Sequence, residues 1–171
     1  MQQTATPEVG GAGARLDVDR LADLAREIMA GNTDLAAIIG MTEDELEAVY
    51  SLGHGFYTSG RYGDALDIFR FLCMHRHMDP RFWFGLGATN QMLGDHATAV
   101  TAYRTCAMLD LEDAQVPMRA AECFRAMGDA ESTRQALEAV VEVSKGKPAQ
   151  AAYAKRADAM LEQMRTGAAQ P

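Results

Sequence analysis

Apolar positions along the chain recur at the spacing of amphipathic helices. From Leu16 to Ile28, Leu, Ala and Ile side chains fall on one helical face with charged residues between them, and Gly31 with the following Asn ends that segment. A second helix is expected after Thr42, where the stretch TEDE places Glu45 three residues beyond a hydroxyl, the spacing of a capping box. The pattern therefore predicts an all-α protein.

Three glycines divide the middle of the chain at a regular interval. Gly60, Gly94 and Gly128 follow one another at intervals of 34 residues, in the contexts YTSGRYGDAL, NQMLGDHATAV and FRAMGDAESTR. Each context is typical of a tight turn between two helices, and 34 residues is the period of the tetratricopeptide repeat. The interval predicts three tandem helical hairpins that stack into a short superhelix.

Small and bulky residues alternate within the same period. Gly53 and Gly87 are 34 residues apart, as are Ala65 and Ala99, and each pair holds the same place in its hairpin. Such small residues allow helix backbones to approach closely, while large side chains fill the remaining space. We expect the filling side chains to be Phe69, Trp83 and Tyr103, with Trp83 in the core.

The third hairpin departs from the first two. Thr133 holds the place of Ala65 and Ala99, and Pro117 is compatible only with the first turn of a helix. A further helix is expected from Pro148 onward, as a cap on the stack. Its expected packing residues are Ala151, Ala154, Leu161 and Met164.

These patterns divide the chain into four parts. We predict a disordered tail over residues 1–14, an N-terminal helical dimerisation segment over 15–41, a repeat domain with its capping helix over 42–165, and a second tail over 166–171.

Charge and composition narrow the function classes. The 171 residues include 16 Lys and Arg against 24 Asp and Glu, for a formal charge of -8, so direct contact with a nucleic-acid backbone is not expected. The first residues form neither the basic start nor the apolar stretch of a signal peptide, and no run is long enough to cross a bilayer. We expect a cytoplasmic protein that does not insert into membranes.

No motif predicts catalysis, a cofactor or a metal site. The cysteines Cys73, Cys106 and Cys123 form no C-x-x-C pair and are expected to be buried thiols in a reducing compartment. The stretch GHGFYTSG lacks the Lys-Ser/Thr of a phosphate loop. His75 and His77 are interpreted as solvated residues of a connector, since no further ligand lies at a recognised spacing.

Several blocks of sequence resemble a particular family of repeat proteins. FLC at 71–73, DPRFWFGLG at 79–87, AMLDLED at 107–113 and AAEC at 120–123 are similar to the class II chaperones of type III secretion, the LcrH/SycD kind, and the resemblance spans roughly residues 32–165. It implies an ATP-independent chaperone that holds hydrophobic translocator proteins in the bacterial cytoplasm, with an extended client segment in a concave groove. It also implies a homodimer formed through N-terminal helices and, for some members, assistance to a transcriptional activator.

The groove is expected on the first helix of each hairpin. A strip of aromatic and weakly charged side chains on that face suits an extended apolar peptide. The expected groove residues are Tyr50, His54 and Tyr57 in the first hairpin, Arg81, Phe84, Ala88 and Gln91 in the second, and Met118, Glu122 and Arg125 in the third.

Two interpretations concern partners. The N-terminal segment carries more apolar surface than one hairpin requires, which predicts a dimer interface at Leu21, Leu24, Ile28, Leu35, Ile38 and Ile39. The alternative to a chaperone is a scaffold or regulatory adaptor whose groove binds a structured partner or a chain terminus. Arg81 and Arg125 would form only a sparse carboxylate clamp for that role.

Overall fold

The structure is a computed structural model that describes residues 23, 26 and 40–167. Contacts divide the chain into two units, Met1–Thr33 and Asp34–Pro171. Asp23 and Arg26 are the described residues of the first unit. The predicted dimer-interface residues Leu21, Leu24, Ile28, Leu35, Ile38 and Ile39 lie outside the described residues, as do residues 1–14 and 168–171.

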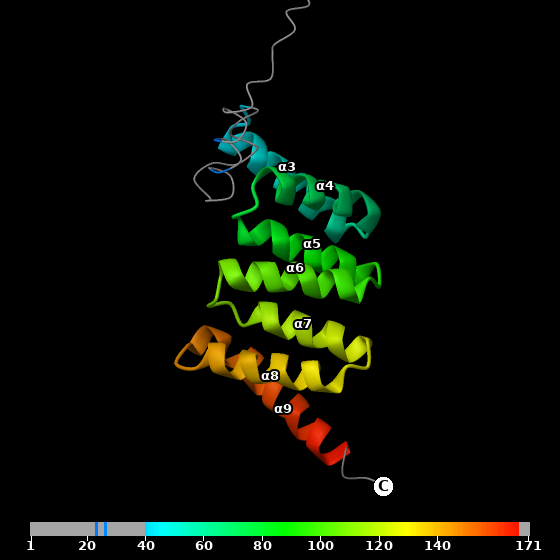
Figure 1. Cartoon of the computed structure of the whole chain (residues 1–171), viewed down its shortest axis with the longest axis vertical. Coiled ribbons are helices and arrows are strands. Elements are labelled where there is room, and N and C mark those ends of the chain that lie inside the picture. The colour runs from blue at the N-terminus through cyan, green and yellow to red at the C-terminus, as the bar shows by residue number, and fades with distance from the viewer. Residues whose placement is uncertain (1–22, 24–25, 27–39, 168–171) are drawn as a thin grey trace, which may run out of the picture. The chain divides into compact units, whose positions relative to one another are not determined.

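The second unit consists of helical hairpins followed by one further helix (Figure 1). Its elements, in chain order, are α3 (Glu43–Thr58), α4 (Tyr62–His75), α5 (Pro80–Met92), α6 (His96–Leu109), α7 (Gln115–Ala126), α8 (Ala130–Ser144), the 3-10 turn η1 (Pro148–Gln150) and α9 (Ala151–Gly167). Each helix packs on the next along the chain, and α3 also contacts α5, as α5 contacts α7. The prediction of an all-α stack of three hairpins with a C-terminal helix is confirmed.

The same turn closes each hairpin. Gly60, Gly94 and Gly128 have φ angles of 79°, 82° and 76°, a left-handed conformation that glycine adopts without steric cost. The amide of the following residue donates to a carbonyl of the preceding helix, over 2.9 Å from Arg61 to Phe56 and 3.0 Å in the second and third hairpins. This is the hydrogen bond of a Schellman motif, so the glycine period fixes where each helix ends.

Close helix packing requires the small residues. A Cβ atom at Gly53 would lie 2.8 Å from Ile68 Cγ2, and one at Gly87 would lie 2.7 Å from the Tyr103 ring. The closest approach is at Gly85, where a Cβ would lie 2.2 Å from the ring of the buried Phe69. The predicted complementarity of glycine and aromatic residues is therefore confirmed, with Gly85 as a contact that the period alone did not indicate.

The core divides into three clusters along the stack. Phe69 and Phe82 belong to the first, Tyr103 and Val116 to the second, and Met118 to the third. Trp83 packs on the first and second clusters, and its indole N–H donates to the His77 carbonyl over 2.7 Å. The expectation that Trp83 is a packing residue is confirmed.

The predicted cysteine burial is also confirmed, because Cys73, Cys106 and Cys123 are all buried free thiols. Burial raises the pKa of Cys73 and Cys106 to about 12 and that of Cys123 to about 11. Such thiols remain protonated near neutral pH and are poor nucleophiles.

The packing face of the C-terminal helix agrees only in part with the prediction. Ala151 is exposed, whereas Ala157 is fully buried and Tyr153, Met160, Leu161 and Met164 pack beside it. The prediction for Ala151 was wrong, whereas the packing predicted for Leu161 and Met164 is confirmed. The helix also runs to Gly167, two residues beyond the predicted end of the domain.

Candidate peptide-binding groove

Repeat-equivalent positions on α3 and α5 place two aromatic rings on the expected face. Tyr50 and Phe84 are separated by one 34-residue period, and both are half-buried. Packing fixes Tyr50, whose ring centroid lies 6.2 Å from that of Phe69 and 5.7 Å from that of Phe82. Phe84 rests on Tyr103 with centroids 5.7 Å apart. Both rings are therefore held by the core while part of each remains open to a ligand.

Tyr50, Arg81 and Phe84 open into one cavity of about 190 Å³. Its full lining is Tyr50 of α3, Pro80, Arg81 and Phe84 of α5, Cys106 of α6, Gln115 of α7, and Asp110 and Asp113 between α6 and α7. Residues from both sides of the second hairpin thus converge on one pocket. We name these eight residues the α3–α5–α7 pocket.

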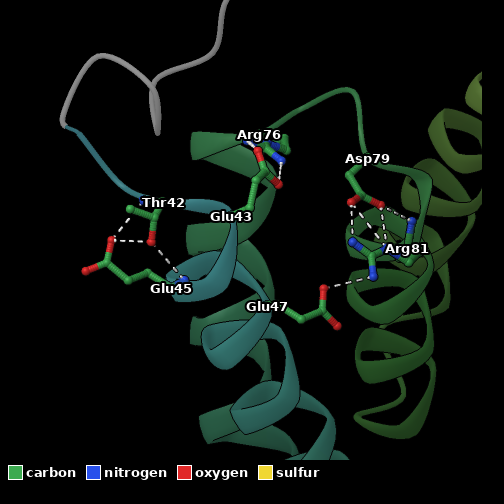
Figure 2. A network of polar contacts seen from close by, with 7 residues as sticks. All are labelled: Thr42, Glu43, Glu45, Glu47, Arg76, Asp79 and Arg81. Atoms are coloured by element: carbon green, nitrogen blue, oxygen red, sulfur yellow. Dashed lines mark hydrogen bonds and ion pairs between the residues drawn. The ribbon is translucent and has the colours of Figure 1, made fainter.

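Two carboxylates hold the guanidinium of Arg81 (Figure 2). Its guanidinium donates to Asp79 over 2.8 Å and to Glu47 over 3.0 Å, and lies 5.0 Å from the centroid of Tyr50. Hydrogen bonds to Asp79 raise the pKa of Arg81 above its usual range. The cation is therefore matched by two acids of its own chain.

Hydrogen bonds and an ion pair hold the N-terminus of α3 near Arg81. Thr42 and Glu45 form the predicted capping box, with the Thr42 amide 2.8 Å from Glu45 Oε2 and the Glu45 amide 3.2 Å from Thr42 Oγ1. Arg76, at the end of α4, pairs with both carboxylate oxygens of Glu43 (Figure 2). With the Glu47 contact to Arg81, these bonds connect α3 to α4 and α5.

At the other end of α5, two predicted groove residues belong to a polar network. Gln91 accepts a hydrogen bond from the Tyr103 hydroxyl over 2.8 Å and donates to Glu122 over 3.1 Å. Glu122 also pairs with Arg119 at 3.3 Å and with Arg156 of α9 at 2.6 Å. Burial raises the pKa of Tyr103, which keeps its hydroxyl as a donor. Gln91 and Glu122 thus connect α5, α7 and α9.

The remaining predicted residues lie at different depths. His54 is exposed, with its ring 6.5 Å from that of Tyr50. Tyr57 is half-buried and meets Tyr62 edge-on at 5.6 Å between centroids. Ala88 is 8% exposed and offers little surface. Arg125 is exposed and, with Arg156 of α9, lines a separate hollow.

The prediction for Met118 was wrong. Its side chain is 1% exposed and belongs to a core cluster with Leu137 of α8 and Ala157 of α9. Met118 lies one repeat period after Phe84. In the third hairpin, α8 and α9 cover this position, whereas in the second hairpin the equivalent Phe84 remains half-buried. An unbranched thioether side chain fills such a covered site readily.

Comparisons with known proteins agree with this geometry. The tetratricopeptide repeat family model matches residues 46–79 and 80–113. Low calcium response locus protein H of Yersinia pseudotuberculosis is 34% identical over 134 residues, which cover 78% of this chain and 80% of the relative. The chain belongs to the LcrH/SycD family of type III secretion chaperones.

Solved structures extend this family relationship. A type III secretion complex from Aeromonas hydrophila superposes with a TM-score of 0.82 at 33% identity, covering 88% of this chain and 99% of that chain. The Yersinia enterocolitica type III secretion chaperone SycD, solved with a peptide of the translocator YopD, gives a TM-score of 0.70 at 34% identity, covering 74% of this chain and 96% of SycD. Members of the LcrH/SycD family are therefore similar to this chain in fold across most of their length.

Metal-binding and membrane-spanning features are absent from the part of the chain that the structure describes. No three His, Cys, Asp or Glu residues there are grouped to hold a metal ion. No helix there is long and apolar enough to cross a bilayer. The interpretation of His75 as a solvated connector residue was wrong, because it ends α4 and stacks on Phe71 with 3.9 Å between ring centroids.

The acidic side of the pocket was not predicted from the sequence. Asp113 lies one repeat period after Asp79, and Gln115 one period after Arg81. The period therefore held a signal for both residues, since Asp79 and Asp113 each precede the first helix of a hairpin. Asp110 gave no such signal, because its contribution depends on the path of the chain between α6 and α7.

Proposed function

We propose that the protein is a cytoplasmic bacterial chaperone that holds an extended apolar segment of a type III secretion translocator along the inner face of α3, α5 and α7. Binding keeps the client soluble before secretion and involves no covalent chemistry. Support at the level of the family comes from SycD, which is 34% identical and was solved with a peptide of the translocator YopD.

The observation that carries the proposal is the shared pocket of Tyr50, Arg81 and Phe84. Two half-buried rings supply apolar area at positions that packing has already fixed, so little ordering free energy is lost when a peptide lies on them. Each Å² of apolar surface removed from water contributes about 25 cal/mol. Polar partners for the peptide backbone are available beside the rings, at Gln115 within the pocket and at His54 on α3.

The scaffold alternative is less well supported. A clamp for a chain terminus requires cations that are available to a carboxylate, but Arg81 already binds Asp79 and Glu47. Arg125 lies at a different hollow, with Arg156. The two arginines therefore line separate sites, and an extended apolar client fits the inner face better than a terminal carboxylate does.

Co-expression with a hydrophobic translocator of the same secretion system tests the proposal. A soluble complex of defined ratio should appear in size exclusion with light scattering, and Tyr57→Ala with Phe84→Ala should reduce the recovered complex at least tenfold. Phe71→Ala is the matched control, because this half-buried ring lies on α4, the outer helix of its hairpin. A client that precipitates with the unaltered protein, or a double variant that recovers as much complex as the control, would contradict the proposal.

We also propose that two copies associate through the N-terminal segment that contains Leu21, Leu24 and Ile28. The apolar side chains at helical spacing support this assignment. Removal of residues 1–40 should reduce the number of chains per particle, measured by light scattering, from two to one. An unchanged number of chains per particle would place the interface elsewhere.

A further inference from the structure

The α3–α5–α7 pocket has the size and the walls of a side-chain subsite. Its volume of about 190 Å³ is below the several hundred Å³ of typical small-molecule sites. Two aromatic rings, Tyr50 and Phe84, form apolar walls, and Pro80 adds another. A pocket of this kind along a groove accepts one side chain of an extended peptide.

The charges around the pocket are unequal. Its one cation, Arg81, is neutralised by Asp79 and Glu47. Asp110 and Asp113 have no ion pair among the described residues, and each uses one carboxylate oxygen to accept a nearby backbone amide, from Glu112 over 3.0 Å and from Gln115 over 2.8 Å. Two carboxylates with unused acceptor capacity therefore face the same small cavity as the rings.

A buried thiol shares the pocket with these two carboxylates. The buried Cys106 thiol forms part of its lining and donates to the Pro80 carbonyl over 3.3 Å. Burial raises the pKa of Cys106 most, and Asp113 and Asp110 raise it further. The two carboxylates therefore add to the effect of burial in keeping the Cys106 thiol protonated.

We infer that the α3–α5–α7 pocket selects a lysine or arginine side chain of the client, with its carbon stem against Tyr50 and Phe84 and its charged end at Asp110 and Asp113. This inference rests on the proposed function and adds a charge requirement to it. Long cationic side chains bury their methylenes on apolar surface and leave the charge at the edge. The ring faces add a cation–π attraction.

Other occupants fit the pocket less well. An acidic side chain would meet two unpaired carboxylates, and Arg81 is already engaged. A purely apolar side chain would satisfy the rings but leave the acceptor oxygens without a partner. A metal ion lacks a suitable group of ligands among residues 40–167.

The test uses the YopD peptide bound by the similar chaperone SycD as its probe. Each position of the peptide is replaced in turn by lysine, by norleucine, which keeps the carbon stem without the charge, or by glutamate. Fluorescence anisotropy of the full-length protein then gives the ratio of affinities at each position. At one position, lysine should bind about fivefold more tightly than norleucine and glutamate more weakly than both.

Asp110→Asn with Asp113→Asn is the decisive variant. Asparagine keeps an oxygen for the two backbone amides, so the α6–α7 connection should fold as before, which circular dichroism and thermal unfolding would verify. The lysine-to-norleucine ratio should fall to near one. The matched control, Asp67→Asn with Glu138→Gln, removes two exposed carboxylates of α4 and α8 and should leave the ratio unchanged.

The outcomes separate the two claims. Peptides that bind with no lysine preference at any position, or with a preference that survives the Asp110 and Asp113 substitutions, would overturn the charge assignment while the proposed function stands. Failure of every peptide to bind would overturn both. A preference that also shrinks as sodium chloride rises from 0.05 to about 0.5 M would agree with an ionic contact near the surface.

Discussion

The first two hairpins and the third share a period but differ in what their inner positions do. Tyr50 and Phe84 are half-open on α3 and α5, whereas the equivalent Met118 on α7 is buried. Glycine meets an aromatic ring between the helices of the first two hairpins, but the third has Ala121 and Leu137 in its core. The repeat therefore fixes the backbone path, while the next helix in the stack determines which positions remain open.

The largest effect should come from Met118→Ala. Removing a buried Met side chain should lower the free energy of unfolding by about 2–4 kcal/mol, because the side chain leaves a cavity among Leu137, Val140 and Ala157. Urea unfolding followed by circular dichroism would measure the loss. Phe84→Ala, at the equivalent half-open position, should cost less stability and more client affinity; the reverse ranking would remove the distinction between the two hairpins.

Gly85→Ala should break the close packing that characterises the first two hairpins. A Cβ at this site would lie 2.2 Å from the buried Phe69 ring, so we expect a loss of about 1–3 kcal/mol despite the better helix propensity of alanine. Gly55→Ala is the matched control, since a Cβ there meets nothing within 4 Å. It should stabilise α3 by about 0.5–1 kcal/mol in thermal or urea unfolding. Equal effects at both sites would contradict the packing argument.

Arg156→Ala should loosen α9 from the third hairpin. The substitution leaves Glu122, whose side chain is 14% exposed, with one fewer charged partner, and we expect a loss of about 1 kcal/mol. Hydrogen exchange should accelerate for α9 amides near Ala157 and much less for α3. Arg165→Ala removes a pair within the exposed face of α9 and should have almost no effect. The same exchange in both variants would show that the Glu122 contact does not hold α9.

The smallest expected effect is on how the free energy of unfolding decreases at acidic pH. Asp95 and Asp129 cap α6 and α8, and hydrogen bonds from Thr98 and Ser132 lower the pKa of each below its usual range. A lowered pKa in the folded state contributes stability above the unfolded pKa near 4, and this contribution is lost as pH falls through the folded value.

The double variant Asp95→Asn with Asp129→Asn keeps both helix caps. Its stability should therefore decrease less than that of the unaltered protein as the pH falls below about 4. Melting temperatures measured from pH 7 to pH 2.5 would check this. The N-terminus of α4 has Arg61 at the equivalent position, without a side-chain cap, so this position should make no such contribution. A double variant whose melting temperature depends on pH in the same way as that of the unaltered protein would contradict this role of Asp95 and Asp129.

Much of the candidate site could be predicted from local pattern. The places of Tyr50, Arg81 and Phe84 follow from helical spacing within the period, and the structure brings them to one pocket. The roles of Gln91 and Glu122 could not be predicted in this way. Gln91 bonds to Tyr103 of α6, and Glu122 pairs with Arg156 of α9. Contacts between residues this far apart in the chain have no local signal.

Local sequence signals specify the helices, their turns and the period, because capping boxes, left-handed glycines and amphipathic spacing act over a few residues. They also indicate where small residues allow close packing. Three features depend on packing between helices: Met118 is covered, Glu47 of another helix neutralises Arg81, and Asp110 and Asp113 face the aromatic pocket. Exposure and electrostatic environment depend on which helices meet in space, and that is settled when the stack forms.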